Sequence, residues 1–230
     1  MNLSQFETAC GNELGLNTTS EKTTIDDAIN AGVLRVLEDT HCYVKKTDFT
    51  GFDGTSVDYT MDSTIMEIVE LQLTSVGTVY ALERLSAIDL LERRRVGQPT
   101  GSPTQFYAVT GANLIMFYPA PGSSDTLSIY NVPIPTALSA SGDDPSSVSL
   151  GGIPSMLHKA ILYFAYSELA SYDDDQTSAQ GQRYRDWYDK EITRYRDILR
   201  KRGGSRNARA VVNAKRRRKP FHDNSVYPRT

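Results

Sequence analysis

The sequence predicts an α+β fold: a four-helix antiparallel bundle with an inserted β-rich subdomain and an extended basic C-terminal tail. Three observations support this prediction. Apolar residues recur at three- and four-residue spacings near both ends of the chain, which is the period of a helix. Between these segments lie short runs rich in β-branched and aromatic residues, which are typical of strands. The last residues are strongly basic and lack the apolar pattern of a core.

Two helices are expected at the start of the chain. The first lies within the first 16 residues, which carry a helical apolar stripe, and Gly15 provides its stop. The second begins near Thr24, whose hydroxyl can cap it, and continues to about His41. Each helix carries an apolar stripe along one side, so each requires a packing partner elsewhere in the chain.

The middle section, residues 43–135, is expected to form the β-rich subdomain with one short helix. That helix covers residues 87–95, and Gly111 with Ala112 forms a tight turn between two strands. We expect a meander of short antiparallel strands. Their ranges are 57–60, 65–76, 79–85, 105–110, 113–118 and 126–132.

The helical pattern returns after a polar connection. Residues 136–152 are rich in Ser, Gly and Asp and are predicted to form a flexible loop. A third helix then opens at Pro154, and a fourth with a Tyr-rich apolar face covers about 179–202. We expect residues 1–42 and 153–202 to associate as one antiparallel helical bundle.

The sequence contains no supported enzyme site, and neither a cofactor nor a metal is expected. It lacks a Gly-rich phosphate loop, a Ser nucleophile elbow and a zinc-binding HExxH pattern. His41 beside Cys42 is better explained as a helix-end histidine next to a packed thiol than as a metal site. Asp173, Asp174 and Asp175 lack the spacing of a calcium loop, so we expect one of them to cap the next helix. A site built from scattered carboxylates is the remaining enzyme hypothesis.

Charge is divided sharply along the chain. Residues 1–199 contain 14 basic and 27 acidic side chains, whereas residues 200–230 contain 11 basic side chains and one acidic side chain. An acidic body disfavours general nucleic-acid binding, but the basic end would be attracted to phosphate or to an acidic protein surface. No apolar run approaches the roughly 20 residues that a membrane helix needs, so no membrane partner is expected.

The tail, residues 203–230, has three competing interpretations: a disordered solubilising segment, a nucleic-acid arm, or a segment that docks on a partner protein. Its spaced apolar anchors favour docking, in which charge steers the encounter and burial follows. The candidate docking residues are Arg206, Arg209, Val211, Val212, Lys215, Arg216, Arg217, Arg218, Lys219, Phe221 and Tyr227.

A second basic cluster follows the short helix in the middle section. Arg93, Arg94 and Arg95 would complement the negative end of that helix if they were simply solvated. The functional alternative is that these arginines contact a neighbouring acidic subunit.

Three stretches carry a resemblance to a known family. Residues 103–109 (PTQFYAV), residues 114–121 (LIMFYPAP) and residues 130–135 (YNVPIP) resemble a recurring arrangement in head–tail adaptors, or connectors, of tailed bacteriophages. A Ser/Asp-rich loop, an Ile-Pro helix and a Tyr-rich last helix follow in the same order. The long strand in the middle section resembles the tail tubular protein A type of short-tailed phages. The similarity covers about residues 20–202.

The resemblance implies a structural role in the virion and no enzymatic activity. Such adaptors are made in the host cytoplasm and form a ring, usually of twelve copies, beneath the portal protein at the neck. Their C-terminal segment docks on the portal, the ring receives the next neck or tail protein, and double-stranded DNA passes through the channel without specific binding. In this sequence the matching docking segment is residues 203–230. The alternative is a DNA-binding protein that acts through the same basic tail.

Overall fold

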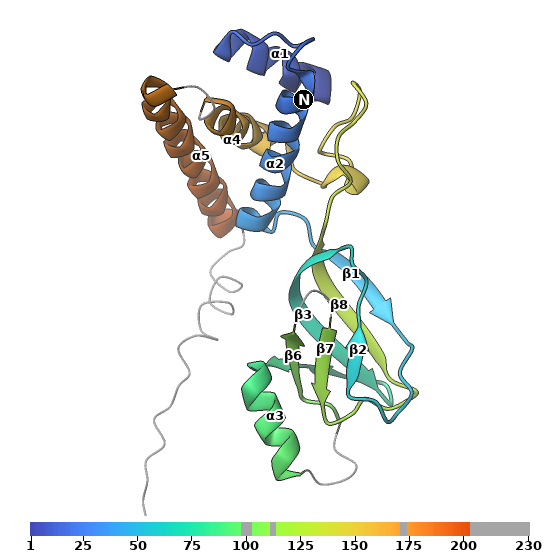
Figure 1. The fold of residues 1–230 in the computed structure, drawn as a ribbon. Helices are drawn as coiled ribbons and strands as arrows, with labels where there is room; N and C mark the ends of the chain where they lie inside the picture. The colour runs from blue at the N-terminus through green and yellow to red at the C-terminus, as the bar shows by residue number, and fades with distance from the viewer. Residues whose placement is uncertain (98–102, 111–113, 171–173, 203–230) are drawn as a thin grey trace, which may run out of the picture.

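A computed structural model describes residues 1–97, 103–110, 114–170 and 174–202, and the side chains of the last helix from residue 179. The helices near both ends of the chain form one unit, and the strands with one short helix form a second (Figure 1). The helices are α1 (Leu3–Leu14), α2 (Lys22–Thr40), α3 (Ala87–Val96), α4 (His158–Ala170) and α5 (Asp174–Arg202), with 3-10 turns at Val148–Leu150 and Ser155–Leu157. The strands are β1 (Lys45–Phe49), β2 (Asp58–Thr60), β3 (Ile65–Ser75), β4 (Thr78–Ala81), β5 (Glu83–Arg84), β6 (Phe106–Thr110), β7 (Leu114–Tyr118) and β8 (Thr126–Pro133).

The α+β class agrees with the structure, but the predicted four-helix antiparallel bundle is wrong. The described residues form five helices and two four-stranded sheets. Helix α1 lies across the ends of its neighbours instead of alongside them (Figure 1). Helices α2 and α5 run in the same direction, since Arg35 of α2 lies by Tyr188 and Asp39 lies by Arg196 further along α5.

The burial of α4 explains why no bundle forms. In a four-helix bundle each helix buries one stripe in a shared core. Helix α4 instead buries most of its circumference, so α1, α2 and α5 pack around it. Its buried residues are His158, Ala160, Ile161, Leu162, Ala165, Tyr166, Ser167, Leu169 and Ala170.

The ends of the first two helices were predicted unequally well. Helix α1 has a capping box formed by Asn2 and Gln5 and ends at Gly15, which is left-handed as expected. The expected cap at Thr24 is wrong, because α2 already begins at Lys22 and Glu21 precedes it without a side-chain cap. The apolar stripe of α2 is buried as expected, and Cys10 of α1 joins it in the same core, where burial raises the pKa of its thiol to about 12.

Gly32 allows α2 and α4 to approach closely. A Cβ atom at this position would lie 2.9 Å from the carbonyl oxygen of Ile161 in α4. We therefore expect Gly32→Ala to lower the free energy of unfolding by about 1–3 kcal/mol, although alanine is the better helix former. Urea unfolding of the purified protein measures this loss. Gly142→Ala, which would meet nothing within 4 Å, is the control, and equal stability of both variants would contradict the prediction.

The strands form two sheets packed face to face rather than a single meander. Their orders are β1-β8-β3-β4 and β2-β7-β6-β5, and all pairs are antiparallel except β5 with β6. Apolar side chains fill the space between the sheets. They are Phe52, Leu71, Leu73, Leu82, Tyr107, Ile115, Phe117, Leu127 and Ile129.

Helix α3 covers the far side of the β2-β7-β6-β5 sheet (Figure 1). Side chains alternate across a strand, so Tyr107 points between the sheets while Ala108 points toward α3. Leu90 of α3 is fully buried against Ala108, Met116 and Tyr118. The β-unit therefore has three layers: α3, the sheet beneath it, and the β1-β8-β3-β4 sheet on the opposite side.

Residues 136–152 run along the helical unit and contact it at several points. Leu138 is buried, and its backbone exchanges two hydrogen bonds with the side chain of Asn30 in α2. Ser146 Oγ lies 3.1 Å from Nε2 of His158 at the start of α4. His158 is buried, and this burial, followed by the charge of the nearby N-terminal amino group, lowers its pKa. These contacts fix the segment that returns the chain from the β-unit to α4.

Candidate interaction surfaces

The end of α2 joins the two units of the molecule. His41 follows α2 in a left-handed conformation, and its backbone N–H donates to the carbonyl of Leu37. Its Nε2 atom lies 2.9 Å from Oε2 of Glu67 in β3. The expectation of a helix-end histidine is confirmed here, and a carboxylate of the β-unit is its partner. Cys42 is half-buried beside it.

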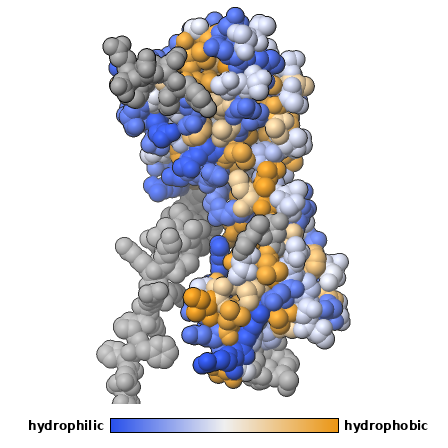
Figure 2. Space-filling view, in the orientation of Figure 1, coloured by the Kyte–Doolittle hydropathy of each residue, from blue (hydrophilic) through white to orange (hydrophobic). Residues whose placement is uncertain are grey.

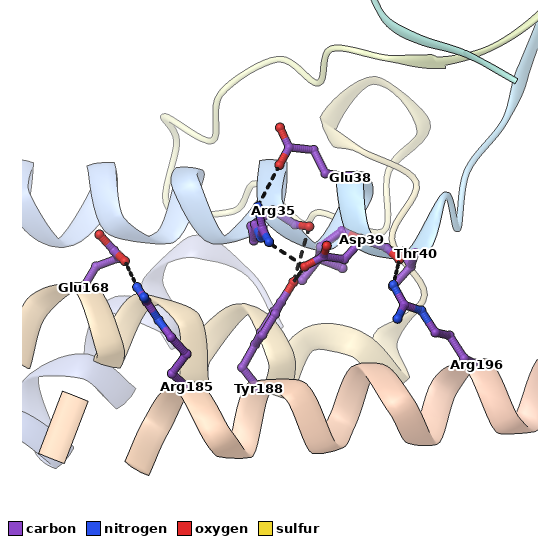
Figure 3. Close-up of polar contacts among 9 residues, drawn as sticks. Arg35, Glu38, Asp39, Thr40, Glu168, Arg185, Tyr188 and Arg196 are labelled. Carbon is purple, nitrogen blue, oxygen red and sulfur yellow. Dashed lines mark hydrogen bonds and ion pairs between the residues drawn. The ribbon is translucent and has the colours of Figure 1, made fainter. Parts of the chain in front are cut away.

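A group of polar contacts centred on Asp39 connects this end of α2 to α5 (Figure 3). We call these contacts, made by Arg35, Asp39 and Tyr188, the Asp39 seam. The buried Tyr188 donates its hydroxyl to Asp39 Oδ2 at 2.6 Å. Arg35 Nε, one turn earlier in α2, lies 3.0 Å from the same carboxylate, so the carboxylate that accepts from α5 is also paired within its own helix. Burial, and then the hydrogen bond to Asp39, raises the pKa of Tyr188, so the phenol stays protonated as the donor.

Two arginines of α5 extend this seam in opposite directions (Figure 3). Arg196 donates to the backbone carbonyl of Asp39, and Arg185 pairs with Glu168 of α4 at 3.0 Å. Helix α5 is therefore held along its length and ends at Arg202, after a basic last turn. This end lies close to the point where α2 leads into the β-unit (Figure 1). Arg202, the last residue of α5, directly precedes the basic segment 203–230 in the sequence.

Several predicted residues lie outside the described part of the chain. The candidate docking residues from Arg206 to Tyr227, the turn at Gly111 and Ala112, and Asp173 belong to this group. The side chains of Asp174 and Asp175 are likewise not described, although both residues are part of α5.

The three arginines at the end of α3 have different surroundings. Arg94 is partly buried. Its Nη2 atom donates hydrogen bonds to the backbone carbonyls of Val57 and Phe117, each at 3.0 Å, and to Asp58 Oδ1 at 2.7 Å. It fastens α3 to the edge of the sheet. The guanidinium of Arg93 lies 4.1 Å from the centre of the Phe106 ring, which is a cation–π distance.

Arg93 and Arg95 are both exposed, whereas Arg94 is partly buried. The three arginines could not be distinguished from the sequence, because spacing alone does not show which side of a short helix faces a sheet. In the structure Arg93 and Arg94 make contacts within the β-unit.

Within the described ranges, no group of three or more His, Cys, Asp or Glu residues is placed to hold a metal ion. None of the helices in the described part of the chain is long and apolar enough to cross a membrane.

Two separate cores are joined at the end of α2, and each presents charged or apolar side chains outward. The chain belongs to the SU10 adaptor protein family, whose model matches residues 1–215. This is a phage head–tail adaptor family and not a known enzyme family. The expected membership in a head–tail adaptor family is therefore confirmed. The finer expectation, the tail tubular protein A type, is not confirmed by this match. A search of curated proteins finds no match.

Proposed function

We propose that this chain is the adaptor between the portal and the tail of a phage virion, where copies of it form a ring below the portal. The ring closes the DNA-filled head, offers the attachment site for the next neck or tail protein and forms part of the ejection channel. Family membership supports the adaptor role. The single observation that carries the finer proposal is the division of charge between residues 1–199 and 200–230.

An acidic body suits a channel through which DNA must slide. Residues 1–199 have an excess of 13 acidic side chains. Negative charge on a channel wall repels phosphates, so the duplex does not adhere, whereas a basic lining would retard it. The DNA therefore passes without being bound.

The basic tail suits attachment to an acidic portal surface. It leaves from the end of α5, which the Asp39 seam holds against α2. Each subunit of a ring supplies one tail, so a modest affinity per tail becomes strong attachment of the whole ring through effective concentration. Because every tail starts from the same fixed point on its subunit, all of them reach the portal in the same way.

Phage particles made without this chain test the proposal. We expect heads that package DNA but do not acquire tails, and we expect addition of the purified chain to restore tail joining and infectivity. Electron microscopy and plaque counts measure both results. Normal tails and normal infectivity in particles that lack the chain would refute the proposed function.

A further inference from the structure

Helix α3 exposes apolar side chains on the side that faces away from the sheets. Leu90 is buried, whereas Ile88 is 71%, Leu91 is 50% and Val96 is 83% exposed. Ile88, Leu91 and Arg95 are three and four residues apart, so they share one side of the helix. Figure 2 shows orange side chains gathered over α3, with blue ones beside them. A helix that is apolar on two sides is normally covered on both, and this side is uncovered in the described residues.

The opposite side of the β-unit offers complementary chemistry. Leu71 and Leu73 of β3 are fully buried between the sheets, so Glu70 and Thr74 point to the outer face of the β1-β8-β3-β4 sheet. The Glu70 side chain is exposed there. Val79 of β4 pairs with Thr74 and is 59% exposed. This face therefore presents a carboxylate and an apolar side chain to solvent.

We propose that the outward side of α3, formed by Ile88, Leu91, Arg95 and Val96, docks on the outer face of the β1-β8-β3-β4 sheet of a second copy of this chain. The inference rests on the proposed function, because the contact repeats around the ring. A ring of identical subunits needs a head-to-tail interface between two different surfaces of each subunit. The two faces lie on opposite sides of the same three-layered unit, as such an interface requires.

Charge selects a second copy over an unrelated partner. Arg94 is held at the sheet edge and the guanidinium of Arg93 lies over the Phe106 ring, whereas the exposed Arg95 shares the side of α3 that carries Ile88 and Leu91. The body of the chain is acidic, and Glu70 lies on the face that a neighbour in the ring would present. Pairing Arg95 with Glu70 while Ile88 and Leu91 cover Val79 satisfies both the charged and the apolar surface.

A charge swap tests this contact on DNA-filled heads that lack the chain. Purified variants are added, and the number of copies bound per head is counted by single-particle fluorescence. We expect Arg95→Glu and Glu70→Arg each to lower ring occupancy about tenfold, and the double variant to restore it to within about twofold. Ile88→Gln with Leu91→Gln is expected to lower occupancy at least as much. Val148→Gln, at an apolar position 65% exposed and remote from α3, serves as the control.

The altered side chains are exposed, so thermal unfolding should show every variant as stable as the original chain. Full occupancy by the two single-charge variants, or no rescue by their combination, would overturn the interface while leaving the adaptor function intact. An unaltered chain that never accumulates on heads would overturn both the interface and the proposed function.

Discussion

Removal of residues 203–230 is expected to leave a folded protein that no longer joins DNA-filled heads. The described fold ends at Arg202, and its two cores are complete without the segment that follows. The deletion removes eight of the eleven basic side chains of residues 200–230, since Arg200, Lys201 and Arg202 lie in α5 and stay behind with it. We expect unchanged circular dichroism and urea unfolding, and a loss of head-bound protein of about 100-fold or more, because every subunit of the ring loses its attachment.

A second variant keeps the length of the tail but replaces each Lys and Arg of residues 203–230 with Gln. It separates the effect of tail charge from the effect of tail length. If charge steers docking, this variant should also fail to accumulate on heads. The alternative function, DNA binding through the tail, predicts instead that the intact chain binds random duplex DNA with steep salt dependence and that both variants lose this binding. Heads that retain normal occupancy after the deletion would contradict the docking role of the tail.

Asp39→Ala is expected to produce a large loss of stability for a polar substitution, about 2–3 kcal/mol in the free energy of unfolding. The Asp39 carboxylate accepts the hydroxyl of Tyr188 at 2.6 Å and pairs with Arg35 Nε at 3.0 Å. Its removal leaves the hydroxyl of a buried tyrosine with only the longer contact to the Arg35 carbonyl at 3.3 Å. Urea unfolding at neutral pH measures the loss.

Neighbouring residues supply the control and the pairwise measurement. Glu38 lies one position earlier and pairs with Arg35 at 3.5 Å on the exposed side, so Glu38→Ala should cost less than about 0.5 kcal/mol. A double-mutant cycle of Asp39→Ala with Tyr188→Phe should give a coupling free energy of about 1–2 kcal/mol. A coupling near zero would show that the seam does not stabilise α5 against α2.

The elements themselves could largely be predicted from the sequence, because apolar spacing reports them directly. The expected strand at 65–76 is β3, and the expected helix at 87–95 is α3. β1 was missed because Lys45–Phe49 is a polar edge strand whose burial does not alternate clearly. Its pairing with β8, some 80 residues later, depends on tertiary structure that local pattern does not encode.

The arrangement of the helices could not be predicted for a similar reason. Apolar stripes show that helices pack, but they do not give direction or crossing angle. Gly32 lets α2 approach α4 closely at Ile161, and α4 is surrounded by its neighbours instead of contributing one stripe to a common core. The Asp39–Tyr188 seam was also invisible, because its members are 149 positions apart.

The candidate surfaces were predicted in part. The basic cluster on α3 was found from charge density, yet its division into Arg94 on the sheet edge and Arg95 in solvent required the structure. Which apolar side chains of α3 are buried also required the structure, because Leu90 is buried whereas Ile88 and Leu91 are exposed. The tail was found from composition alone, and its docking role remains a prediction because its residues lie outside the described ranges.

Cryo-electron microscopy of purified virions tests the central claim most directly. We predict a closed ring of this chain immediately below the portal, with the acidic helical and β-units around the DNA path and residues 203–230 of each subunit against the portal. A virion neck without this chain, or a ring held to the portal by another part of it, would contradict the account.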